Sequence, residues 1–132
     1  KNSVYERFMN NLMGYHESLQ ILDGESHLMS EQIQDETLDV CFLDADHRYE
    51  YVKRDIEKFL PKVKSGGILC GHDCEFLEMA NTFTKEEFEL PVCRQGVHAG
   101  VIQAVYESFG SSVILPRIGN SESWSVWVYH KP

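Results

Sequence analysis

Five acidic and imidazole side chains lie in two short segments of the sequence. They are Asp44, Asp46, His47, His72 and Asp73. The first three follow the apolar run 38–43, and the other two follow the apolar run 67–70. Open α/β sheets bind ligands at the carboxyl ends of their strands, so these side chains are predicted to meet at one edge. Asp44, His72 and Asp73 are the predicted ligand set for a divalent cation.

His47 has the chemistry of a proton acceptor. An imidazole with an ordinary pKa of about 6.5 can take a proton at neutral pH. A structural interpretation is equally open. Asp46 and His47 would then cap the following helix, while Asp44 would bond backbone amides of the loop.

These side chains depend on a β-α-β unit. Residues 38–44 form a nearly continuous apolar run ending in acids, which is typical of a parallel strand covered on both faces. Residues 49–63 carry apolar side chains at helical spacing, and the Gly66-Gly67 turn follows them. Residues 67–70 form a second apolar strand. The two strands should be parallel, with a right-handed crossover.

The flanking segments alternate between helix and strand signals. Helices are predicted over residues 3–15, from Ser26 as N-cap to about residue 34, and over residues 101–109. Short strands are predicted over residues 18–22, 112–118 and 124–129, with Gly119-Asn120 between the last two. The last two strands would add an antiparallel ending to the sheet, and residues 74–94 carry no clear pattern.

The length, hydrophobic content and charge of the chain limit the kinds of fold and partner that it can have. The chain has 132 residues, 42% of them hydrophobic, which predicts a single domain over residues 1–132. Its net charge of −9 argues against nucleic acid or an anionic membrane as partner, because both require a basic surface. No apolar run approaches the roughly 20 residues that span a bilayer. We expect a soluble, cytoplasmic protein with a small or neutral partner.

The four cysteines, Cys41, Cys70, Cys74 and Cys93, contain no C-x-x-C pair. Free thiols in a reducing cytosol are the expected state. Cys70 and Cys74 flank His72 and Asp73, so a thiolate metal site is the alternative.

Two motifs carry a family resemblance. They read Asp44-Ala45-Asp46-His47-Arg48-Tyr49-Glu50 and Gly66-Gly67-Ile68-Leu69-Cys70-Gly71-His72-Asp73. Residues 52–56 and Gly100-Val101 fit the same pattern. Together they resemble the class I S-adenosylmethionine-dependent methyltransferases, in particular small domains with D-x-D-H-x-Y-E and G-G-x-x-x-G-H-D motifs. The resemblance implies a Rossmann-like α/β sheet, mostly parallel with an antiparallel C-terminal hairpin.

The resemblance also implies parts that this sequence lacks. In the family, a first strand and a G-x-G loop hold the methionine end of the cofactor, and a second strand ends in an acid for the ribose. No G-x-G occurs here. We therefore expect an N-terminally truncated domain without the first two strands. In the family's strand order, this missing pair would lie in the sheet between the strands predicted at residues 18–22 and 38–44. The exposed edge should pair within the chain or in a homo-oligomer.

Cofactor contacts follow from the resemblance. The turn at Gly24, Glu25 and Ser26 matches the place where the family contacts the adenine ring, and Asp44 and Ala45 end the neighbouring strand. The same turn could be a plain turn and helix cap.

The metal and base also have counterparts. The motif resembles that of the magnesium-dependent catechol and caffeoyl-CoA O-methyltransferases, which place an acid at Asp44 and an acid-amide pair where His72-Asp73 stand. In those enzymes the metal lowers the pKa of a substrate hydroxyl, and a base three residues past the first acid takes the proton. His47 occupies that position and is the predicted catalytic residue.

The predicted activity of the parent is methyl transfer from S-adenosylmethionine to a hydroxyl of a small molecule or sugar. Without the loop that positions the cofactor, we expect this chain alone to be inactive. The alternatives are a metal-dependent hydrolase built on the same acids and imidazoles, and a non-catalytic oligomerising module. His98 could reach the site from the substrate side or be a solvated loop residue.

Overall fold

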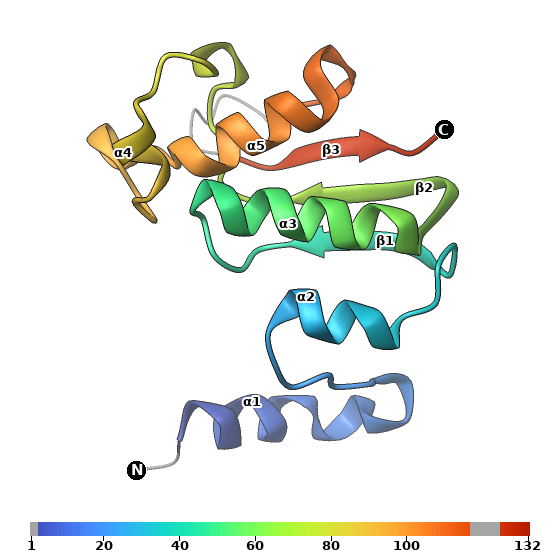
Figure 1. The fold of residues 1–132 in the computed structure, drawn as a ribbon. Helices are drawn as coiled ribbons and strands as arrows, with labels where there is room; N and C mark the ends of the chain where they lie inside the picture. The colour runs from blue at the N-terminus through green and yellow to red at the C-terminus, as the bar shows by residue number, and fades with distance from the viewer. Residues whose placement is uncertain (1–2, 117–124) are drawn as a thin grey trace.

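The structure is a computed structural model that describes residues 3–116 and 125–132 (Figure 1). Its helices are α1 (Val4–Leu12), α2 (Ser26–Met29), α3 (Tyr49–Phe59), α4 (Lys85–Phe88) and α5 (Ala99–Phe109). Its strands are β1 (Leu38–Leu43), β2 (Val63–Gly71) and β3 (Trp127–His130). Short 3-10 helices lie at Met13–Ser18, Ser30–Gln32, Leu60–Lys62, Leu77–Met79, Arg94–Gly96 and Gly110–Ser112.

The strands form one mixed sheet in the order β1-β2-β3. β1 pairs parallel with β2, and Leu43 lies opposite Gly71 at the carboxyl ends of both strands. α3 connects them, which confirms the predicted β-α-β unit. β3 runs antiparallel to β2, with Trp127 opposite Gly71. The predicted antiparallel ending is therefore confirmed for the described part of the chain.

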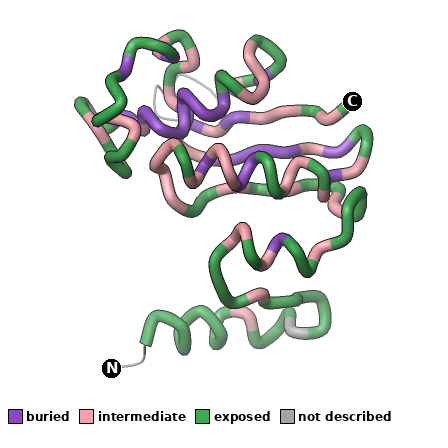
Figure 2. Tube along the Cα trace, viewed as in Figure 1, coloured by how far each residue is buried: buried purple, intermediate pink, exposed green. Residues whose placement is uncertain are grey.

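The core lies between the sheet and the two long helices α3 and α5, which cover one face of it (Figures 1 and 2). Ile56 of α3, Ile102 of α5, Leu69 of β2 and Trp127 of β3 are almost completely buried. Burying an aliphatic side chain of this size contributes about 1.5–3 kcal/mol. This packing holds the ends of β1 and β2 at a fixed distance from the start of α5.

β1 is not covered on both faces as predicted. Val40 and Phe42 on its outer face are 57% and 54% exposed, whereas Cys41 and Leu43 face the core. Within residues 3–116 and 125–132, α3 and α5 lie on one side of the sheet, and nothing packs on the other side of β1. β1 also forms one edge of the sheet, so its outer backbone groups have no neighbouring strand.

The predicted strand over residues 18–22 is wrong. Ser18 ends a 3-10 helix, residues 19–22 have no ladder partner in the described part of the chain, and Leu19 and Ile21 are exposed. A strand exists only through pairing, and the described residues place no strand beside this segment. Its apolar side chains therefore have no sheet to join.

The predicted strand over residues 112–118 is reduced, in its described part, to one antiparallel bridge between Ile114 and Val128. The Gly119-Asn120 turn and Trp124 lie outside the described residues.

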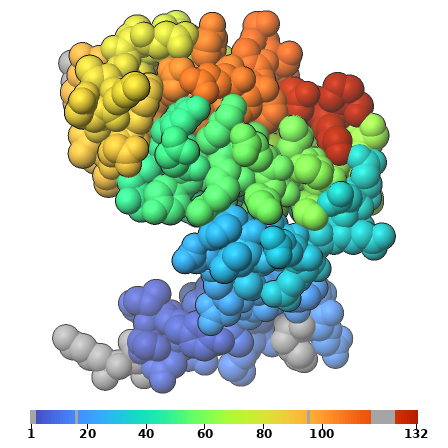
Figure 3. Space-filling view, viewed as in Figure 1, coloured from blue at the N-terminus to red at the C-terminus, as the bar shows by residue number. Residues whose placement is uncertain are grey.

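The predicted cap of α2 is also wrong. Glu25 is the N-cap and Ser26 is the first helical residue, because the Ser26 hydroxyl is engaged elsewhere. α1, in contrast, begins with a capping box between Ser3 and Glu6. α1 buries none of its residues, and it projects from the body of the molecule in the space-filling view (Figure 3). None of the described helices is long and apolar enough to cross a membrane.

Candidate functional site

The carboxyl ends of β1 and β2 bring the two polar segments together. Asp44 and His47 lie in the loop between β1 and α3, while His72 and Asp73 directly follow β2. The Nε2 atom of His47 lies 3.0 Å from Oδ2 of Asp73 and 3.7 Å from Oδ1 of Asp44. The predicted meeting of these side chains at one edge of the sheet is therefore seen in the structure.

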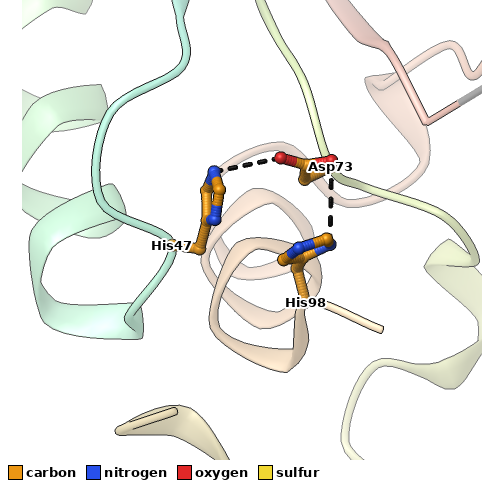
Figure 4. Close-up of side chains that lie close together, drawn as sticks. All are labelled: His47, Asp73 and His98. Carbon is orange, nitrogen blue, oxygen red and sulfur yellow. Dashed lines mark ion pairs between the residues drawn. The ribbon is translucent and has the colours of Figure 1, made fainter. Parts of the chain in front are cut away.

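Asp73 is the centre of the cluster. Its Oδ1 lies 2.8 Å from Nδ1 of His72 and 3.7 Å from Nδ1 of His98, and it accepts a hydrogen bond from the Ser125 hydroxyl at 3.4 Å. The backbone of Asp73 has a φ of 62°, in the left-handed region that non-glycine residues rarely adopt. Such strain, about 1–3 kcal/mol, is concentrated at functional sites. Figure 4 shows His47 and His98 near each other, each joined to Asp73 by an ion pair.

The helix-capping interpretation of the loop fails for both Asp46 and His47. Asp46 accepts hydrogen bonds from the backbone amide of Arg48 at 2.9 Å and from its guanidinium at 2.6 Å. These bonds, the side-chain bond foremost, lower the pKa of Asp46. Arg48 is the N-cap of α3, and no side chain caps that helix. His47 is thus free of a capping role.

His98 joins the site, which sequence reasoning left open. It is the N-cap residue of α5, and its ring lies edge-on to the His47 ring with centroids 4.7 Å apart. Gly100 makes this approach possible. A β-carbon at Gly100 would overlap the carbonyl oxygen of His47 and the amide nitrogen of Tyr49, so only glycine lets α5 begin here.

Glu75 is the residue that sequence reasoning missed. It contacts Nδ1 of His98 through Oε1, and its Oε2 accepts a hydrogen bond from the His98 backbone amide at 3.3 Å. The available signal was its position two residues past Asp73, beyond a strand end. The charged stretch after residue 74 had no regular spacing, so that signal was weak.

The predicted cofactor residues are only partly brought together. Ser26 donates a hydrogen bond to Oδ1 of Asp55 at 2.6 Å, and Asp55 is buried. Asp55 lines a small cavity together with Asp44, Ala45, His47 and His72. Ser26 is therefore linked to the cavity indirectly, by its hydrogen bond to a residue that lines it.

Glu25 lies apart, paired with His27 at 3.4 Å, and Gly24 packs against Met29. The cavity measures about 20 Å³, which suits one water molecule or an ion. It is far too small for an adenosyl group.

Two groups of side chains in the described part of the chain could hold a metal ion. One is the predicted set Asp44, His72 and Asp73, and the other is His47, Asp73 and His98. Neither includes a cysteine, and all four cysteines are free thiols, as predicted. Burial raises the pKa of Cys74 to about 12, which disfavours the thiolate that a metal would require.

Comparisons with known proteins bear on the family and the fold of the chain. Residues 2–74, more than half of the chain, match a family described as a methyltransferase domain. A crystal structure of a protein from Corynebacterium glutamicum has a similar fold, with a TM-score of 0.61 at 11% sequence identity. The match covers 96% of this chain and 53% of that protein, so this chain spans about half its length. No curated protein matches the sequence. The predicted Rossmann-like α/β class is confirmed.

Proposed function

The chain belongs to the methyltransferase domain family, and from that premise we propose that it supplies the acceptor side of an S-adenosylmethionine-dependent O-methyltransferase. The acceptor would be a hydroxyl group of a small molecule or sugar. In this proposal the 132 residues carry the proton-accepting and cation-binding side chains. The seat for the methionine end of the cofactor lies in a strand and glycine loop that these residues do not include.

The observation that carries the proposal is the position of His47. Its Nε2 atom lies within 4 Å of carboxylates from two strand ends, Asp44 and Asp73. A base must lie beside the group that binds the acceptor oxygen, and this is the arrangement of His47 relative to the predicted ligands. His47 caps no helix, so helix capping does not explain its place in the loop.

The donor set fits a divalent cation. Asp44 and Asp73 offer carboxylate oxygens and His72 offers an imidazole nitrogen, all within reach of one ion. Carboxylates alone suit Mg²⁺, and an added imidazole favours Mn²⁺ or a later ion of the same series. Such an ion would bind the acceptor hydroxyl and lower its pKa.

His47 would then take the acceptor proton at Nε2. The side chain of His47 is 26% exposed but its Nε2 atom is buried, so in this proposal the surrounding loops move to admit the acceptor hydroxyl. The neighbouring carboxylate of Asp73 would stabilise the imidazolium that forms, because opposite charges 3.0 Å apart attract. S-adenosylmethionine supplies the methyl group as a sulfonium.

Positioning is what this chain lacks for catalysis. In-line attack requires the sulfonium to be held near the acceptor oxygen, and this positioning can account for several kcal/mol of the barrier. The cavity at the strand ends holds no more than a water or an ion. We therefore expect no methyl transfer from residues 1–132 alone.

The test has two stages. Sequencing the coding region upstream of Lys1 should reveal a strand followed by G-x-G. The longer chain, with labelled S-adenosylmethionine and a panel of catechols and sugars, should then methylate an oxygen only with Mn²⁺ or Mg²⁺ present. His47→Gln should lower kcat by about 10²–10⁴-fold, the usual contribution of a general base. Full activity of His47→Gln, or methylation of carbon or nitrogen alone, would overturn the proposal.

A further inference from the structure

We propose a second metal site, formed by His47, Asp73 and His98, that takes a borderline transition ion such as Zn²⁺, Co²⁺ or Ni²⁺. It differs from the predicted set of Asp44, His72 and Asp73 in two of its three ligands. The two sites share Asp73. Two imidazoles and one carboxylate with open positions suit transition metals better than Mg²⁺.

The distances between the possible ligand atoms bear on whether one ion can bind to all three side chains. Nε2 of His47 lies 3.0 Å from Oδ2 of Asp73, and one ligand atom from each of His47, Asp73 and His98 lies within 4.8 Å of the other two. Two ligands at about 2.1 Å from an ion stand about 3.0 Å apart at a right angle and about 3.6 Å apart at 120°. The separation of His47 and Asp73 falls at the first of these values. The side chains also converge from three elements, as Figure 4 shows.

The environment of the His47 Nε2 atom supports this site. Its Nε2 atom is buried and makes no hydrogen bond within the described part of the chain, although Oδ2 of Asp73 is only 3.0 Å away. The nitrogen is close to the oxygen but not directed at it. A shared ion produces this arrangement, because the lone pair then points at the ion and the oxygen lies about 45° to one side.

Glu75 completes the site as an outer partner. It touches Nδ1 of His98 and accepts a hydrogen bond from the His98 backbone amide, so Nε2 of His98 is the ring nitrogen that remains for an ion. A carboxylate behind a ligating histidine is a regular feature of metal sites, where it sets the tautomer and the ring orientation. The contact between Glu75 and His98 has no role in the proposed methyl transfer. The second metal site gives this contact a function.

Burial and charge favour this set over the predicted one. The side chains of Asp73, His98 and His47 are 14%, 17% and 26% exposed, against 51% for Asp44 and 41% for His72. In the described part of the chain no lysine or arginine pairs with Asp73 or Glu75. The negative charges of Asp73 and Glu75 are thus compensated only by imidazoles, and a cation bound in this partly buried site would neutralise them.

Occupation of this site would bind the Nε2 lone pair that the proposed base requires. Transition ions bound here would thus exclude the proton-accepting role of His47. The proposal does not depend on methyl transfer, because the ion can bind whether or not the chain has activity.

The test is titration of the 132-residue chain with Co²⁺, followed by its visible absorption and by calorimetry. We expect binding of one Co²⁺ without the strong near-ultraviolet band of a cysteine thiolate ligand. His98→Gln should weaken binding at least about tenfold and Glu75→Gln about tenfold, whereas His72→Gln should change it less than about twofold. His130→Gln, at an exposed histidine on β3, is the matched control.

Folding of each variant is checked by circular dichroism. A readout on the unmutated protein keeps the test independent of the variants: Zn²⁺ should shift the ring ¹⁵N resonances of His47 and His98 and leave those of His130 unchanged. The proposal is overturned if no Co²⁺ binds. It is also overturned if the loss follows His72→Gln while His98→Gln binds normally, or if a thiolate band appears.

Discussion

Gly100 lies so close to the backbone of His47 that no β-carbon fits between α5 and the loop that precedes α3. The first turn of α5 therefore rests directly on the segment that carries His47, and His98 is brought beside it. The relative position of the two histidines is set by backbone contact, which is stiffer than contact between side chains.

Gly100→Ala is expected to destabilise the fold. Overpacking against a backbone usually costs about 1–3 kcal/mol, which exceeds the roughly 1 kcal/mol that alanine gains over glycine in a helix. Urea unfolding should show this loss. Gly14→Ala, where an added β-carbon meets nothing within 4 Å, is the control and should be nearly neutral. Equal stability of Gly100→Ala and the unmutated protein would contradict the packing described here.

Tyr49 and Glu107 give a pH-dependent contribution to stability. The Tyr49 hydroxyl donates a 2.5 Å hydrogen bond to Glu107, and this bond, with burial, raises the pKa of Tyr49 to about 12. An unfolded tyrosine titrates near pH 10, so the contribution is fully present below about pH 10 and is lost as the pH rises through about 12.

Tyr49→Phe should therefore lower the free energy of unfolding by about 1 kcal/mol at pH 7. The difference from the unmutated protein should shrink above about pH 10, because the Tyr49 hydroxyl ionises there and the unmutated protein loses the bond that phenylalanine never makes. Unfolding in urea across this pH range measures it, with Tyr106→Phe, an exposed tyrosine of α5, as control. A constant difference up to pH 12 would be evidence against the bond.

Sequence patterns predicted the central part of this fold well. β1, α3 and β2 follow from apolar runs and helical spacing that are local, and the acids and imidazoles at the strand ends follow from topology. Two errors came from partners that no local pattern contains. Residues 18–22 have the composition of a strand, but the described part of the chain places no strand beside them. The Ser26 hydroxyl donates a hydrogen bond to Asp55 of α3 and does not cap α2.

The site was predictable only in part. Asp44, His47, His72 and Asp73 belong to two motifs whose strands are adjacent, so their meeting could be foreseen. His98 and Glu75 come from segments whose paths depend on how α5 packs, and that packing rests on one close glycine contact. Sequence spacing carries no information on such a contact.

The outer face and edge of β1 make a prediction about assembly. Val40 and Phe42 are more than half exposed, and β1 is an edge strand. Exposed apolar edge strands pair readily with other chains, so we expect a homodimer in solution. Light scattering should give twice the 15.2 kDa mass of the chain. The double variant Val40→Lys, Phe42→Lys should be monomeric, and Val92→Lys, at an exposed loop position, should remain dimeric. A monomeric unmutated protein would refute this.

Calorimetric titration of residues 1–132 with S-adenosylhomocysteine, in the presence of Mn²⁺, tests the central claim most directly. In the proposed function, this chain carries the acceptor-side residues, and a segment outside it carries most of the cofactor-binding site. The proposed function therefore predicts no binding in the micromolar range, and binding once a strand and G-x-G loop precede Lys1. Micromolar affinity of the 132-residue chain itself would contradict that division of the site.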